Sequence, residues 1–301
     1  MMVAEPATMI EPLAMRFTSA GLSLNAWQWP NPGKPILLLV HGGRDHARSW
    51  DHVVAALGTD YHVIAPDLRG HGDSDWSPEG HYELADHVLD LAALVEQLPP
   101  GPLTIVAHSL GGNIALRLAG IWPDRFVAMA GIECLEMPLT RSSPVDGIAV
   151  DDRWREWIEQ RHAIDQRAPR HYSSIAAAAQ RMSDEFPTLD AALVDHLARH
   201  AVREASDGWR WKYDNRSRLR PPDDIASHEF DALLANIRCP VLLFYGDQSW
   251  VPLPSPDRLA LLPSIDLRRI TGAGHWLHHE RLAEFVGAVR PFLDQALKEQ
   301  R

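Results

Sequence analysis

The chain has 301 residues, of which 46% are hydrophobic and 23% are charged, a balance typical of a folded globular protein. This composition excludes a disordered tail, a collagen-like fibre and a small disulfide-rich scaffold. Lys and Arg number 29 against 40 Asp and Glu, so the net charge of −11 disfavours nucleic acid and anionic membranes as partners.

The first half of the chain alternates between predicted strands and predicted helices. Residues 16–29 alternate loosely around Gly21 and predict a hairpin of two short strands. Apolar runs bounded by Pro, Gly or Asp predict buried strands at 36–40, 61–65, 103–107 and 126–132. Helical spacing covers residues 50–57, 84–98 and 111–121. This order predicts a parallel sheet with right-handed crossovers.

The pattern changes between about residues 136 and 230. Charged residues cluster there, no strand is evident, and helix-like segments occupy residues 153–167, 173–182 and 188–202. Alternation then resumes with strands at 240–245 and 265–270 and helices at 256–262 and from Glu280 onward. We therefore expect one α/β domain made of residues 1–135 and 231–301, with residues 136–230 inserted after the sixth strand as a helical cap.

The N-terminus and the cysteines bear on location. Residues 1–15 lack the basic start and apolar stretch of a secretory signal, and no window approaches the roughly 20 apolar residues of a membrane span. Cys134 and Cys239 stand in apolar surroundings and are expected to be buried, reduced thiols. Reduced thiols favour a cytoplasmic location.

The segment 107–112, Ala-His-Ser-Leu-Gly-Gly, joins a predicted strand to a predicted helix. This context indicates a nucleophile elbow, a tight turn that presents a serine hydroxyl at the carboxyl end of the sheet, although Ala107 stands where glycine is usual. Ser109 is therefore the candidate nucleophile, and the backbone N–H of Leu110 is a candidate oxyanion donor. The competing interpretation is a loop that merely begins a helix.

Two further segments offer partners for Ser109. The sequence 41–43, His-Gly-Gly, ends a predicted strand, and the N–H of Gly43 is the second candidate oxyanion donor, although a plain turn would have the same sequence. The sequence 272–276, Gly-Ala-Gly-His-Trp, follows the last strand and makes His275 the candidate general base. No carboxylate or thiolate set completes a metal site around the histidines, so we expect neither metal nor cofactor.

Taken in order, the segments 38–43, 67–74, 107–112 and 272–276 resemble the α/β-hydrolase superfamily over most of the chain. The resemblance implies an α/β-hydrolase fold with a mostly parallel, doubly wound sheet, a helical cap, and a structural role for the loop that begins at residue 67. Residues 42–50 and 207–214 are similar to a serine-hydrolase-like branch. The dehalogenases and epoxide hydrolases of the family use an aspartate nucleophile, and Ser109 argues against both.

The acid of the catalytic triad is where the sequence departs from the family. In many relatives the acid lies three residues after a strand-ending glycine, and here that position after Gly246 is Ser249. Glu133, at the end of the strand before the cap, is the first candidate, because a carboxylate buried there is costly without a partner. Asp247 is the alternative, and Glu136 comes third. The competing interpretation of Glu133 is a salt-bridged residue at the hinge of the cap. The competing interpretation of Asp247 is a residue that forms a turn.

Eleven tryptophans exceed seven phenylalanines and five tyrosines. Tryptophan suits either an aromatic pocket or packing between cap and core. Seven lie in the expected cap or beside the candidate loops: Trp50, Trp154, Trp157, Trp209, Trp211, Trp250 and Trp276. The residues expected to line a substrate pocket are His41, Arg44, His108, Trp154, Trp157, Trp250 and Trp276. For Arg44, a surface ion pair with Asp45 is an equal alternative.

The sequence thus predicts a serine hydrolase that cleaves a small-molecule carboxylic ester, apolar or aromatic, through an acyl-enzyme. A C–C bond hydrolase, a lactonase or a lyase would use the same residues. A small-molecule-binding protein with little turnover is the alternative from another class, and the serine at position 249 keeps it open.

Overall fold

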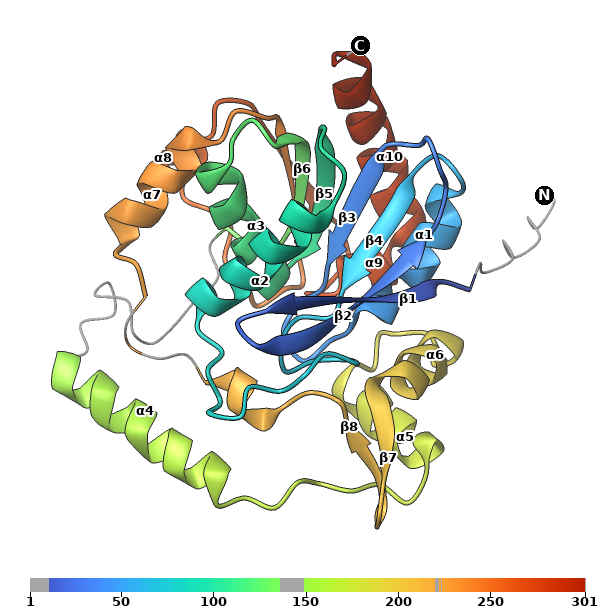
Figure 1. The fold of residues 1–301 in the computed structure, drawn as a ribbon, viewed down its shortest axis with the longest axis vertical. Helices are drawn as coiled ribbons and strands as arrows, with labels where there is room; N and C mark the ends of the chain where they lie inside the picture. Colours follow the sequence, from blue (N-terminus) through green and yellow to red (C-terminus); the bar gives the residue numbers. More distant parts are fainter. Residues whose placement is uncertain (1–10, 136–148, 220–221, 223, 301) are drawn as a thin grey trace.

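The computed structural model describes residues 11–135, 149–219, 222 and 224–300, and its centre is an eight-stranded sheet (Figure 1). The strand order is β1-β2-β4-β3-β5-β6-β9-β10. The strands are β1 (Leu13–Ser19), β2 (Leu22–Trp29), β3 (Ile36–Val40), β4 (His62–Pro66), β5 (Leu103–His108), β6 (Phe126–Ile132), β9 (Val241–Gly246) and β10 (Ile265–Ile270). The hairpin β1–β2 is antiparallel and pairs antiparallel with β4, while all other neighbours are parallel. The expected mostly parallel sheet is confirmed.

Helices cover both faces of the sheet because its strands alternate apolar side chains between two cores. In β3, Leu38 and Val40 face one core, whereas Leu37 and Leu39 face the other. The first core is closed by α2 (Leu84–Gln97), α3 (Leu110–Ile121), α7 (Ser227–Asn236) and α8 (Pro256–Leu259). The second is closed by α1 (Asp51–Leu57), α9 (Leu277–Glu280) and α10 (Leu282–Lys298) (Figure 1).

Residues 149–219, between β6 and α7, stand outside these layers and are called the inserted segment below. It contains α4 (Val150–Asp165), α5 (Ile175–Glu185), α6 (Ala191–Ala201), β7 (Val202–Ala205) and β8 (Gly208–Trp211). The expectation of no strand here was wrong, because β7 and β8 form an antiparallel hairpin. Four-residue strands are too short for a clear alternating pattern, which is why the sequence did not reveal them.

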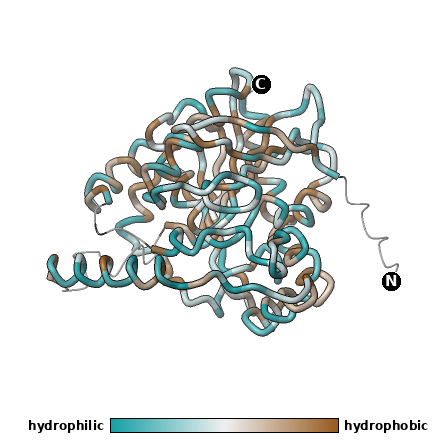
Figure 2. Tube along the Cα trace, turned by 60° about the horizontal axis from the view of Figure 1, so that its bottom comes forward, coloured by the Kyte–Doolittle hydropathy of each residue, from teal (hydrophilic) through white to brown (hydrophobic). Residues whose placement is uncertain are grey.

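The helices of the inserted segment differ in how they are held. Helix α4 has no buried residue, and α5 and α6 pack together around a small apolar cluster that includes Leu189, Val194 and Leu197. Figure 2 shows α4, at the left-hand edge of Figures 1 and 2, as mainly hydrophilic, whereas the sheet region is rich in hydrophobic residues. Helix α4 is held instead by surface polar contacts, such as those that Arg161 donates to the Gly80 and Glu79 carbonyls.

Helix α7 belongs to the layer that covers the sheet, although it begins inside the range expected for the cap. A Cβ placed on Gly120 of α3 would lie 2.3 Å from the carbonyl oxygen of Leu233, so the two helices cross in direct backbone contact. Phe230 and Leu234 of α7 are buried in the same core as α3. Packing onto the sheet layer thus resumes at Ser227.

Both cysteines are free and buried. Burial raises the pKa of Cys134 to about 12 and that of Cys239 to about 11, so both remain neutral thiols at physiological pH. Cys134 packs under the elbow, where a Cβ on Gly112 would approach its sulfur to 2.7 Å. Among the residues that the structure describes, no helix combines the length and apolarity needed to cross a bilayer.

Candidate active site

Ser109 occupies a strained turn between β5 and α3. Its φ of 53° and ψ of −118° are a conformation that residues with side chains rarely adopt. The turn is possible because its neighbours are small: a Cβ on Gly111 would lie 2.4 Å from the carbonyl oxygen of His41. The strand, sharp turn and helix expected from residues 107–112 are all present.

The structure brings Ser109, His275 and Glu133 into one hydrogen-bonded chain. The His275 Nε2 atom lies 3.1 Å from the Ser109 hydroxyl oxygen, and Nδ1 lies 2.5 Å from the Glu133 Oε2 atom. Each residue follows a different strand: β5, β10 and β6. Because parallel strands end at the same edge of a sheet, segments far apart in sequence meet here.

Glu133 is fully buried and is held by three donors. Its φ of 48° marks a second strained residue, at the point where the chain leaves β6. Besides the contact with His275, its Oε1 accepts the Gly246 N–H at 2.8 Å and its Oε2 accepts the Ser249 hydroxyl at 2.5 Å. Ser249, the residue found where many relatives carry the acid, therefore donates to the acid that comes from β6.

Asp247, the alternative acid, lies on the same loop as Ser249 but points elsewhere. It is exposed, and its Oδ1 accepts the Gly272 N–H at 2.7 Å and the Gln248 side-chain amide at 3.2 Å. These contacts fit the turn-forming interpretation of Asp247. Glu136 lies outside the described residues.

The two candidate oxyanion donors lie beside Ser109. Leu110 is the first residue of α3, where backbone N–H groups have no intrahelical partner and the helix dipole favours negative charge. Gly43 lies next to it, since a Cβ on Gly43 would be 3.8 Å from the Leu110 side chain. Gly42 comes closer still to the elbow, because a Cβ placed on it would lie 3.2 Å from the Cβ of Ser109.

His41 and His108 differ from the expectation that they line a pocket, because both are buried and bonded to the main chain. His41 donates from Nδ1 to the Gly42 carbonyl and accepts the Leu68 N–H at Nε2. His108 donates from Nε2 to the His275 carbonyl at 2.9 Å and so holds the histidine loop against the elbow. Burial lowers the pKa of His41 to about 3 and that of His108 well below its usual value, so both rings are neutral.

Arg44 and Asp45 do not pair with each other. Arg44 is half-exposed and lies 3.5 Å from Glu185 at the end of α5, which is a surface ion pair with the inserted segment. Asp45 is buried and accepts hydrogen bonds from the Ser49 hydroxyl and the His46 N–H. Neither contact brings Arg44 to Ser109.

The tryptophans separate into three groups. Trp154 and Trp157 pack edge to face on α4, a helix with no buried residue, so they differ from the pocket-lining expectation. Trp276 stacks on Phe186 of the inserted segment with ring centroids 4.6 Å apart, which is packing between the segment and the core. Trp250 is 64% exposed and its ring lies 5.1 Å from that of His275, so this ring is open to solvent beside the candidate base.

The supporting roles of Ser249 and His108 were not predicted from the sequence. A signal existed for Ser249, because a polar residue in the position of the missing acid suggests a contact to the acid that replaces it. No signal identified His108, because its bond is to a backbone carbonyl that only the fold brings near.

The chain is similar to several known proteins. Residues 37–288 match the sequence model of the alpha/beta hydrolase family. The chain is similar to Esterase Rv0045c of Mycobacterium tuberculosis, at 29% identity over 75% of this chain and 70% of the relative. It is also similar to the 2-(acetamidomethylene)succinate hydrolase of Mesorhizobium japonicum, at 26% identity over 86% of this chain and 88% of the relative.

A solved structure shows the same fold. The thioesterase domain from the curacin biosynthetic pathway superposes with a TM-score of 0.79 at 23% identity, covering 92% of this chain and 99% of that chain. The family match and this superposition confirm the fold expected from the sequence, and the relatives named esterase and hydrolase support a hydrolytic activity.

Proposed function

The chain belongs to the alpha/beta hydrolase family, and on this premise we propose that it is a serine hydrolase that cleaves a small-molecule carboxylic ester through an acyl-enzyme intermediate. The observation that carries the proposal is the continuous chain of hydrogen bonds from Ser109 through His275 to Glu133, with contacts of 3.1 and 2.5 Å. A nucleophile, a base and an orienting acid in this order are the parts that acyl transfer needs.

In the proposed first step, the Ser109 oxygen attacks the ester carbonyl carbon and its proton passes to Nε2 of His275. The carbonyl oxygen takes up negative charge, which the N–H groups of Leu110 and Gly43 stabilise. When the tetrahedral intermediate collapses, His275 gives the proton to the leaving alkoxide, and an alcohol departs. The acyl group then remains bonded to Ser109.

In the second step, water attacks the acyl-enzyme while Nε2 of His275 takes a proton from it. The second tetrahedral intermediate expels the Ser109 oxygen, which recovers the proton from His275, and a carboxylic acid leaves. Glu133 stays ionised throughout, holds the Nδ1–H tautomer and stabilises the imidazolium. No step requires a cofactor.

The contacts of Glu133 bear on the alternative of a binding protein with little turnover. That alternative depended on the absence of an acid at position 249. A buried carboxylate 2.5 Å from the His275 Nδ1 atom weakens it, because the imidazolium formed in catalysis has a counter-charge. The short hydrogen bond from the Ser249 hydroxyl supports the same view, since it orients that carboxylate.

For the substrate we infer an ester with an apolar or aromatic group that contacts Trp250. This exposed ring beside His275 offers an apolar surface next to the reacting atoms. The inserted segment serves as the cap in this proposal, because Phe186 stacks on Trp276, the residue that follows His275. A C–C bond, lactone or thioester substrate would use the same groups, so a substrate panel has to include these bonds.

The test is Ser109→Ala, assayed on p-nitrophenyl esters, lactones and thioesters and with an active-site phosphonate probe. We expect kcat to fall by roughly 10⁶-fold, as in other hydrolases that lose the serine, and labelling to disappear. Ser264→Ala, at an exposed position before β10, is the matched control and should retain both. Undiminished turnover or labelling in Ser109→Ala would refute the serine mechanism.

A further inference from the structure

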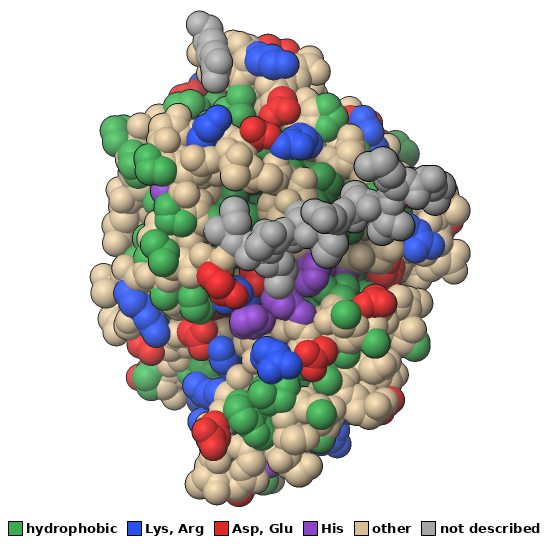
Figure 3. Space-filling model, turned by 90° about the vertical axis from the view of Figure 1, so that its right-hand side faces the viewer, with side chains coloured by type: hydrophobic (Ala, Val, Ile, Leu, Met, Phe, Trp, Pro, Cys, Tyr) green, Lys and Arg blue, Asp and Glu red, His purple; other side chains and the backbone are tan. Residues whose placement is uncertain are grey.

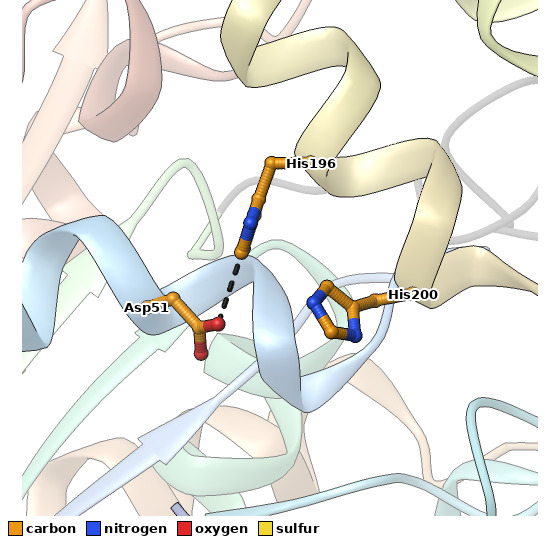
Figure 4. A group of neighbouring side chains, drawn as sticks. All are labelled: Asp51, His196 and His200. Atoms are coloured by element: carbon orange, nitrogen blue, oxygen red, sulfur yellow. Dashed lines mark ion pairs between the residues drawn. The ribbon is translucent and has the colours of Figure 1, made fainter. Parts of the chain in front are cut away.

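A second group of polar side chains joins the inserted segment to the core. His196 and His200 lie one turn apart on α6, so they project from the same face of that helix. They meet Asp51, the first residue of α1 (Figure 4). One ligand atom of each residue lies within 4.8 Å of the other two, and His196 Nε2 is 3.1 Å from the Asp51 carboxylate.

This group is separate from the candidate active site. It is built on α1 and α6, whereas Ser109, His275 and Glu133 follow β5, β10 and β6. His196 and His200 are half-buried, so solvent reaches their rings. Figure 3 shows histidine side chains gathered at the surface of the right-hand side of Figure 1, where α1 and α6 lie.

The donors are those of a transition-metal site. Two imidazoles and one carboxylate suit zinc, nickel, copper and cobalt, whereas calcium and magnesium prefer oxygen ligands.

Arg48 contacts Asp51 of this group, and its contacts are compatible with a metal. Its guanidinium bonds to Asp51 at 2.7–2.9 Å and also lies 3.2 Å from Glu11. Two carboxylates therefore face one guanidinium. A carboxylate has about four lone-pair directions, so Arg48 can orient Asp51 while the carboxylate still binds a metal.

A third imidazole lies beside these ligands. The ring of His52 packs edge to face on His196, with ring centroids 4.9 Å apart. Its Nδ1 atom is buried and has no hydrogen-bond partner among the described residues. An unpartnered nitrogen in a cluster of donors is a further reason to expect a ligand here.

We propose that Asp51, His196 and His200 bind a divalent transition-metal ion of the zinc class, with the remaining position filled by water or His52. Three protein ligands and an open position are a common arrangement for zinc. Because the ligands come from α1 and α6, the bound ion ties the inserted segment to the core. A metal bound only to the folded state then stabilises it by mass action.

The proposal is tested by calorimetric titration of the intact chain, stripped with chelator, with ZnCl₂, and by its thermal unfolding with and without ZnCl₂. We expect one zinc ion per chain and a higher unfolding midpoint. In His200→Gln and His196→Gln the affinity should fall by about 100-fold or more, since even an outer-shell partner is worth about 10–100-fold. His162→Gln, on the exposed face of α4, is the control and should bind as the wild type does.

A second probe removes the ambiguity of a variant that folds poorly. Co²⁺ bound to the intact wild-type chain should give visible absorption bands of a site with nitrogen and oxygen ligands, and ZnCl₂ should abolish them by competition. Zinc binding that persists in both His200→Gln and His196→Gln, or that is lost only in His275→Gln, would overturn the proposal, because the ion would then sit elsewhere or at the active site. Absence of zinc binding to the wild type would overturn it as well.

Discussion

The core and the inserted segment hold their polar groups in opposite ways. In the core, the Glu133 carboxylate is fully buried and accepts from His275, Ser249 and Gly246. On α4, no residue is buried, and charged side chains pair along the helix surface, as Arg155 does with Asp152 at 2.5 Å. A buried carboxylate is expensive without partners, whereas an exposed ion pair contributes little. The Glu133 carboxylate therefore depends on its partners in the core, whereas the ion pairs along α4 contribute little to stability.

The boundary between these regions is itself informative. Helices α5 and α6 touch the core through Trp276 and Asp51, and these contacts lie beside the proposed substrate site and in the proposed metal site. Helix α4 reaches the core through Arg161, which donates to the Gly80 and Glu79 carbonyls. Any influence of the inserted segment on the core is thus expected through α5 and α6 and not through α4.

Among the variants that compare the core with the inserted segment, Glu133→Gln should have the largest effect. The amide keeps the shape of the side chain but removes the charge that orients and stabilises His275, so kcat should fall by about 10⁴-fold, the size of the effect of the equivalent change in a serine protease triad. Steady-state kinetics on the most reactive p-nitrophenyl ester measures this.

Two matched variants complete that experiment. Asp247→Asn alters a turn contact in the core, and Asp152→Asn alters a surface pair on α4; both should keep kcat within a few-fold. If Asp247→Asn lost activity and Glu133→Gln did not, the acid would be Asp247 and the comparison between buried and exposed carboxylates would fail.

A second prediction concerns acid stability. His279 is buried, and burial, with the charges of His52 and His196, lowers its pKa to about 3. The unfolded chain, with an ordinary histidine pKa near 6.5, binds one more proton than the folded chain between these values. This group therefore makes the free energy of unfolding fall as the pH falls from about 6.5 towards 3, by about 1.4 kcal/mol per pH unit.

Urea unfolding of wild type and His279→Leu at pH 4.5 to 7, with chelator present, measures that slope. The variant should have a shallower dependence, and the difference isolates His279 from Asp45, whose pKa burial raises to about 7 and which acts in the opposite direction. His162→Leu, exposed on α4, should leave the slope unchanged. If both variants changed the pH dependence of the free energy of unfolding equally, the buried histidine of the core would not differ from the exposed histidine of the inserted segment.

The smallest predicted effect compares two exposed tryptophans. Trp250→Ala removes a ring beside His275 and should raise KM for aromatic esters by about three- to tenfold with little change in kcat, because one aromatic contact is worth about 0.5–1.5 kcal/mol. Trp154→Ala, on α4, should leave KM unchanged. A rise in KM for Trp154→Ala of the same size would mean that α4 reaches the substrate.

Much of the fold could be predicted because strands buried on both faces of a parallel sheet consist of continuous runs of apolar residues. The strands at 36–40, 126–132 and 265–270 have the bounds that the sequence indicated. The hairpin of β7 and β8 was missed, because four residues carry too short a pattern. The sequence placed the end of the cap at residue 230, whereas α7 already begins at Ser227. Polar residues surround the first turn of α7, so only its packing on Gly120 assigns it to the core.

The sequence by itself determined the layers of the sheet, the turn at Ser109 and the order of the candidate residues, because these depend on local patterns of apolar and small side chains. Only the tertiary structure decided which acid faces His275, what Ser249 does, and which tryptophan lies beside the reacting atoms. These depend on contacts between residues that are distant in the sequence, such as Ser249 with Glu133, 116 positions apart, and Trp250 with His275. Local sequence patterns do not determine the distances between such residues. Those distances are set by the packing of the strands and helices.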